Sequence, residues 1–168
     1  VIELAYDIQS GSYTDFAVSS PDRLQWYAKE IYTLCSKFIF EQDTILDCGA
    51  GELTTISALS QYLPKQTRLL ACDISLSRLR VGRRFAESSM RDDLAKNLEL
   101  FVADMGHMPL ADKCVDVVFT SHALEPNHGR EANLLSELLR ISRRHLILFE
   151  PSWENANKDI QARMEKYG

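Results

Sequence analysis

The sequence contains no C-x-x-C pair, the spacing that is typical of zinc sites and thiol redox motifs. Its four cysteines stand far apart, and most of them fall within apolar runs: Cys35, Cys48, Cys72 and Cys114. Buried free thiols are common in a reducing compartment, whereas disulfides are not. We therefore expect free cysteines, a cytoplasmic protein and no metal site.

Long hydrophobic runs are also missing. No stretch approaches the roughly 20 apolar residues that a helix needs to cross a bilayer. The first residues, V-I-E-L-A-Y-D, lack the pattern of a signal peptide. We expect no membrane partner. Because the first residue is Val1, we also expect that the chain can begin inside a longer gene product.

An excess of positive charge is the third absence. The chain has 19 Lys and Arg against 24 Asp and Glu, a net charge of −5, which argues against nucleic acid as the main partner. One basic cluster stands out, and its helical spacing predicts a solvated helix face: Arg78, Arg80, Arg83 and Arg84.

Glycine is scarce, yet two of the seven glycines stand two positions apart, at Gly49 and Gly51. They follow an apolar run and precede a helix start at Thr54, in the stretch T-I-L-D-C-G-A-G-E-L from Thr44 to Leu53. Glycine lets the chain turn at otherwise unfavourable φ, and a helix start offers unpaired N–H groups. This stretch predicts a strand, a tight turn and a site for a small charged ligand.

Apolar runs alternate with helical periodicity along the whole chain. Such alternation implies right-handed crossovers, so we expect one domain (1–168) with a doubly wound, mostly parallel α/β sheet. The expected strands are 44–46, 69–72, 98–103, 115–120 and 145–149. The expected helices are 21–38, 54–62, 75–97, 131–141 and 159–167. An irregular arm (1–20), with no strand and at most a short helical turn, precedes the core (44–150), and a tail (151–168) follows it.

Polar residues stand at the carboxyl end of each expected strand. In parallel sheets, ligands bind beyond these ends, where the strand order reverses. The residues concerned are Asp47, Cys48 and Gly49, then Asp73, then Asp104, then Ser121 and His122, and last Glu150.

Two ligand classes fit this arrangement. A dinucleotide site has a third glycine where this chain has Thr54, and the carboxylate of Asp47 would repel a pyrophosphate. That carboxylate suits a ligand with positive charge, such as S-adenosylmethionine, which carries a sulfonium and an amino group. Asp73 does not discriminate, because both ligands contain a ribose. An NAD-type oxidoreductase therefore remains the alternative.

Four successive motifs carry a family resemblance. They are I-L-D-C-G-A-G-E, L-L-A-C-D-I-S, F-V-A-D-M-G-H-M-P-L-A-D and V-D-V-V-F-T-S-H-A-L-E. In this order they resemble the motifs of class I S-adenosylmethionine-dependent methyltransferases, over roughly residues 44–150. The family often has a third glycine where this chain has Leu53, and it usually has two more strands after the fifth. We expect either that the chain is a fragment or that its sheet ends early.

The resemblance implies a role for each motif residue. Asp73 would bind the ribose hydroxyls, Ile74 and Met105 would lie on the adenine, and Asp104 would accept from the adenine amino group. Ser121 and His122 would lie near the transferred methyl. The methionine side would be shaped by Asp47, Cys48, Gly49, Ala50 and Gly51. For Asp73 and Asp104, a cap or turn residue is the alternative.

The acceptor is less marked in the sequence. His122 is the candidate general base, with Glu125 behind it, and an ordinary loop histidine is the alternative. A metal set of His122, Glu125 and His128 is disfavoured because Pro126 interrupts any helical spacing. S-H-A-L stands where some relatives have N/D-P-P-Y/F, and together with the acidic balance this favours a small-molecule acceptor. A catalytically silent subunit and a homodimer through the fifth strand are further possibilities.

Overall fold

The computed structural model describes residues 2–127 and 129–167. Within these residues, five parallel strands form one sheet in the order β3, β2, β1, β4, β5. The strands are β1 (Thr44–Cys48), β2 (Arg68–Asp73), β3 (Glu99–Val102), β4 (Val115–Ser121) and β5 (Ser142–Phe149). The doubly wound α/β prediction is confirmed, and the strand order reverses between β1 and β4.

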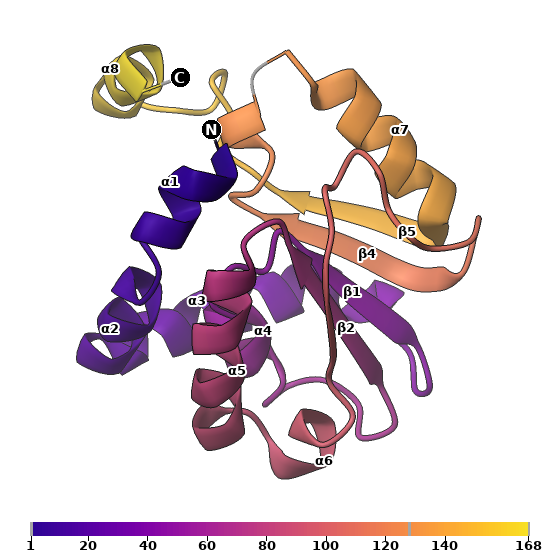
Figure 1. Ribbon diagram of the computed structural model, residues 1–168. Coiled ribbons are helices and arrows are strands. Elements are labelled where there is room, and N and C mark those ends of the chain that lie inside the picture. The colour runs from indigo at the N-terminus through magenta and orange to yellow at the C-terminus, as the bar shows by residue number, and fades with distance from the viewer. Residues whose placement is uncertain (1, 128, 168) are drawn as a thin grey trace.

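Helices cover both faces of the sheet (Figure 1). On one face lie α3 (Pro21–Cys35), α4 (Thr54–Leu59) and α5 (Leu76–Ser89), and on the other lies α7 (Glu131–Ile141). Successive strand residues point to opposite faces, so Ile45 packs in the cluster under α3, α4 and α5, whereas Leu46 packs under α7. All four cysteines are free.

The N-terminal arm differs from the expectation of irregular chain. It forms α1 (Ile2–Ile8) and α2 (Ser12–Ser19), which lie beside α5 (Figure 1). The cause is a contact with the glycine turn: the buried Glu52 carboxylate accepts hydrogen bonds from the amides of Gly11 at 2.9 Å and Thr14 at 2.7 Å. A carboxylate 41 residues away along the chain therefore fixes the corner between the two helices.

The expected helix 75–97 is also wrong in extent. It ends at Ser89, and a separate short helix, α6 (Asp92–Ala95), follows. Between them, the amide of Arg91 donates to Ser60 Oγ at 3.1 Å and its guanidinium donates to the Leu63 carbonyl at 2.8 Å. These bonds turn the chain back toward the end of α4.

The C-terminal part of the described chain adds no strand after β5. A short 3₁₀ turn (Glu125–Asn127) precedes α7, another (Ser36–Phe38) follows α3, and α8 (Lys158–Tyr167) lies beyond β5. Within the described residues β5 is thus the last strand, which agrees with both expectations for the tail. Among the described residues, none of the helices has both the length and the apolar character that a membrane crossing requires.

Candidate functional site

A cavity of about 380 Å³ opens at the carboxyl ends of the strands, beside the point where their order reverses. It brings together residues from four of the predicted motifs. Those that line it are Cys48, Gly49, Asp73, Ile74, Asp104, Met105 and His122. Four predicted cofactor-binding residues are not among the lining residues: Asp47 in β1, Ala50 and Gly51 in the turn after it, and Ser121 at the end of β4.

The glycine turn allows a close approach between backbone segments. Gly49 has a φ of +77°, and a Cβ there would lie 2.4 Å from the Cβ of Ala123 and 3.2 Å from the Cε of Met105. The amides of Gly49 and Ala50 both donate to the Cys72 carbonyl at 2.9 Å. A Cβ at position 49 would overlap Ala123, so glycine lets the turn after β1 lie directly against the turn after β4 at the edge of the cavity.

Asp73 connects the turn to α5. Its carboxylate is only 5% exposed, and its two oxygens accept from the amides of Gly51 at 2.8 Å and Ser75 at 2.9 Å. Each carboxylate oxygen can accept a second hydrogen bond. Asp73 is thus a turn residue, as the alternative stated, and it keeps acceptor capacity at the cavity wall.

Asp47 is buried behind the turn. Burial, together with the nearby charge of Asp73, raises its pKa to about 8. The carboxyl group is therefore largely protonated near pH 7 in the ligand-free protein. A cation bound nearby would favour its ionised form.

Asp104 has a partner that the sequence analysis missed. Both of its oxygens accept from Nη2 of Arg130, at 2.8 and 2.9 Å, and Oδ1 also accepts from the amide of Gly106 at 2.8 Å. Partial burial acts to raise the pKa of Asp104, but these bonds outweigh it and the pKa is lowered. The only signal in the sequence was an arginine directly before an amphipathic helix.

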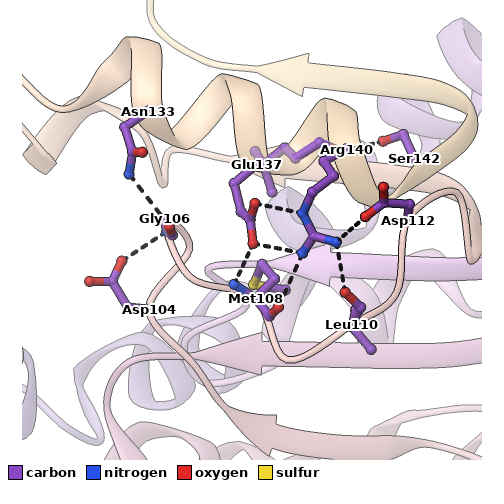
Figure 2. Close-up of polar contacts among 10 residues, drawn as sticks. Asp104, Gly106, Met108, Leu110, Asp112, Asn133, Glu137, Arg140 and Ser142 are labelled. Carbon is purple, nitrogen blue, oxygen red and sulfur yellow. Dashed lines mark hydrogen bonds and ion pairs between the residues drawn. The ribbon is translucent and has the colours of Figure 1, made fainter.

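The loop that carries Asp104 and Met105 is fastened to α7. Figure 2 shows Glu137 accepting from the amide of Met108, at 2.8 Å, while Arg140 donates to the carbonyls of Met108 and Leu110. The hydrogen bond from Arg140 and that from the Met108 amide help to lower the pKa of Glu137 to about 2. The loop is thus held by charge-assisted bonds, which are stronger than neutral ones.

A second cavity of about 530 Å³ adjoins the first, and Tyr6, His122 and Pro126 line both. Its wall is rich in aromatic side chains from the arm and from α3: Tyr6, Tyr13, Phe16 and Tyr27. Ser121 and Glu125 also line it, and Ser121 Oγ lies 2.8 Å from the hydroxyl of Tyr27.

His122 lies where the two cavities meet. Its φ is +53°, a left-handed conformation that is uncommon outside glycine and that concentrates at functional sites. Glu150 holds the adjoining turn by accepting from the amides of Ala123 and Leu124. Nδ1 of His122 is 3.8 Å from Glu125 Oε2. His128 lies outside the described residues, and the described residues contain no metal-binding group of three His, Cys, Asp or Glu.

One expectation about the surface is wrong. Arg80, Arg83 and Arg84 are exposed, but Arg78 is only 8% exposed and lines the first cavity. Helical spacing places residue 78 near the start of α5, where the Asp73 turn and the arm cover it. The arm could not be placed from the sequence.

The five-stranded parallel sheet, its glycine turn after β1 and its acidic residue after β2 form a Rossmann-like fold of the kind that class I S-adenosylmethionine-dependent methyltransferases have. A profile of the family described as "Methyltransferase domain" matches residues 45–145. The chain belongs to this family. S-adenosylmethionine is its cofactor. The residues fit it, because each oxygen of Asp73 at the cavity wall can accept a further hydrogen bond.

Individual methyltransferases are also similar to this chain. The demethylmenaquinone methyltransferase of Thermobifida fusca is 29% identical over 111 residues, which are 66% of this chain and 44% of that protein. A methyltransferase of Methanosarcina mazei is 21% identical with a TM-score of 0.64, covering 79% of this chain and 63% of that one.

A third relative comes from the complex of the Haloferax volcanii Trm112 methyltransferase activator with a methyltransferase. It is 23% identical with a TM-score of 0.61, covering 82% of this chain and 55% of that one. The chain thus spans about half the length of these relatives.

Proposed function

We propose that this protein transfers a methyl group from S-adenosylmethionine to a small-molecule acceptor. The observation that carries the proposal is the junction of two cavities, where Tyr6, His122 and Pro126 line both. When bound, the cofactor supplies a methyl group on a positively charged sulfur, which is an activated leaving group. The protein then has to align two reactants and exclude water.

Under this proposal, the residues of the first cavity hold the cofactor. Asp73 would bind the ribose hydroxyls, Ile74 and Met105 would contact the adenine, and Asp104 would accept from its amino group beside Arg130. The methionine side would be formed by Asp47, Cys48, Gly49, Ala50 and Gly51. The support is their convergence on one cavity or the turn beside it.

The second cavity would hold the acceptor. Its aromatic wall favours a planar ring, because aromatic side chains stack on rings and bury large apolar area. The Thermobifida fusca relative is named for demethylmenaquinone, a ring-containing small molecule, which agrees with this choice. Ser121 and Tyr27 would orient the acceptor through their paired hydroxyls.

His122 would act as the general base, with Glu125 orienting its ring. A positioned base contributes about 10²- to 10⁴-fold to the rate of a proton-transfer step. His122→Gln is therefore expected to lower kcat by that range, with a much smaller change in the affinity for S-adenosylhomocysteine, because His122 lies only at the junction of the two cavities. His107→Gln is the matched control, because His107 is exposed and lines neither cavity. An unchanged kcat in His122→Gln would mean that His122 is an ordinary loop histidine and not the general base.

Calorimetry with S-adenosylhomocysteine and with NAD tests the cofactor site. We expect binding of the first and none of the second, and the reverse result would overturn the proposal. A labelled-methyl screen over small ring compounds then tests the acceptor. Cofactor binding without transfer to any compound would point to a subunit that needs a partner protein, as the Haloferax chain is found with an activator.

A further inference from the structure

Arg78 is a buried cation without a hydrogen-bonded partner. It stands in the first turn of α5, its residue is only 8% exposed, and it lines the cofactor cavity. Its Nε is buried, and the guanidinium has no hydrogen-bond acceptor among residues 2–127 and 129–167. Leaving a buried charged donor unsatisfied is costly, so such a group in a cavity wall is suited to bind an anionic group of a ligand.

The surroundings position the guanidinium over the glycine turn. It lies 4.8 Å from the ring centroids of both Tyr6 and Tyr13, so two rings hold it from the arm. A Cβ on Gly51 would lie 2.3 Å from Nη2, which means that Arg78 reaches this place only because residue 51 is glycine. Asp73 Oδ2 is 4.0 Å from Nη1, too far for a hydrogen bond.

The other guanidinium of this cavity is already occupied. Arg130 is bound by both oxygens of Asp104 at 2.8 and 2.9 Å. The two carboxylate oxygens of Asp73 accept hydrogen bonds from two backbone amides. Of the described side chains that line the cavity, Arg78 is therefore the one arginine that can bind an anion without giving up a hydrogen bond.

We propose that Arg78 binds the α-carboxylate of the amino-acid part of S-adenosylmethionine. This carboxylate is the one anionic group of that molecule, and a guanidinium fork matches it with two parallel hydrogen bonds. The inference rests on the proposed cofactor site. It assigns a role to a side chain that the periodicity of α5 alone would place on a solvated face.

The test is calorimetry with S-adenosylhomocysteine and with its decarboxylated analogue, which keeps the adenosine, sulfur and amine but lacks the carboxylate. Wild-type protein should bind S-adenosylhomocysteine at least about 10-fold more tightly than the analogue, the lower end for a hydrogen bond to a charged group. Arg78→Met should weaken S-adenosylhomocysteine binding by about 10- to 100-fold and leave analogue binding within about twofold. Arg78→Lys, which keeps a point charge, should recover part of the loss.

Arg80→Met is the matched control, since Arg80 is exposed on the same helix, and it should change neither affinity. Equal losses for both ligands in Arg78→Met would overturn the inference and show that Arg78 acts through Asp73 or the arm. Equal wild-type affinities for the two ligands would overturn it as well, whether or not any variant folds. Failure of the wild-type protein to bind either ligand would overturn the proposed cofactor site itself.

Discussion

Leu53 occupies a backbone conformation that favours glycine. Its φ is +58°, and its side chain is fully buried in the core under α3, α4 and α5. Class I S-adenosylmethionine-dependent methyltransferases, whose motifs this sequence resembles, often have a third glycine at this position. The turn thus keeps a left-handed residue before α4, and the burial of the leucine side chain offsets the strain of that conformation.

Asp73→Ala is expected to weaken S-adenosylhomocysteine binding by about 1.5 to 3 kcal/mol, the range for hydrogen bonds to a charged group. The reason is the acceptor capacity that Asp73 keeps at the cavity wall. Calorimetry measures the affinity, and thermal unfolding checks the turn, which Asp73 also holds. Asp92→Ala, an exposed carboxylate outside the cavity, is the control. Unchanged affinity would mean that the ribose is bound elsewhere.

Asp47→Asn is expected to be more stable than wild type near pH 7. Burial raises the pKa of Asp47 from 3.8 to about 8, so between these values the folded state holds a proton that the unfolded state has lost. The wild-type free energy of unfolding should therefore fall as pH rises through this window, by at most about 1.4 kcal/mol per pH unit. The variant lacks this slope.

Urea unfolding of both proteins at pH 4.5, 6 and 7.5 measures the difference. The advantage of Asp47→Asn should grow with pH and should be smallest at pH 4.5. Parallel pH profiles would mean that Asp47 is ionised in the folded protein, against the burial of its carboxyl group.

At the scale of elements, the close contact between α5 and the glycine turn positions the site. A Cβ on Gly82 of α5 would lie 2.6 Å from the backbone carbon of Glu52 and 2.8 Å from Leu53 Cγ. Gly82 therefore lets the helix lie directly on the segment that follows Gly51.

Gly82→Ala should lower the free energy of unfolding by about 1 to 3 kcal/mol, as overpacking does, although alanine is the better helix former. It should also weaken S-adenosylhomocysteine binding, because the turn must shift. Chemical unfolding and calorimetry measure the two effects. Arg84→Ala, on the exposed face of α5, should stay within about 0.5 kcal/mol of wild type. If Gly82→Ala instead raised the free energy of unfolding, the segment at Glu52 and Leu53 could shift without destabilising the fold, and the prediction would be wrong.

For the whole molecule, cofactor binding and folding should be linked. The cavity is built from segments between Glu3 and Arg130, so only the folded chain can form it. S-adenosylhomocysteine at 100 times its Kd should raise the free energy of unfolding by about 2.7 kcal/mol, and NAD should not. Thermal unfolding at several ligand concentrations measures this. A melting temperature that does not respond to S-adenosylhomocysteine would contradict the assignment of the cavity.

The sheet leaves β3 and β5 as edges within the described chain. An exposed edge can pair with another strand, so a homodimer through β5 stays a prediction that sedimentation can test. The relatives are about one and a half times as long as this chain, and their additional residues are a second candidate for covering that edge.

Several features could be read from the sequence because they depend on near neighbours. Alternating apolar periods predicted the five strands and the helices α3 and α7, since burial on one face repeats with the geometry of the element itself. The polar residues after β1, β2 and β3 were predicted to converge because parallel strands end at one edge. The glycine turn was recognisable from Gly49 and Gly51 alone.

Only the tertiary structure decided which polar groups take which partners. Glu52 orders the arm from 41 residues away, and Arg130 binds Asp104 across 26 residues, distances over which local patterns carry no information. The same holds for Arg78, whose burial depends on the arm that covers it. The sequence thus determined the sheet and the edge at which its polar residues converge. The long-range contacts decided which charges of that edge are hydrogen-bonded to a partner and which is not.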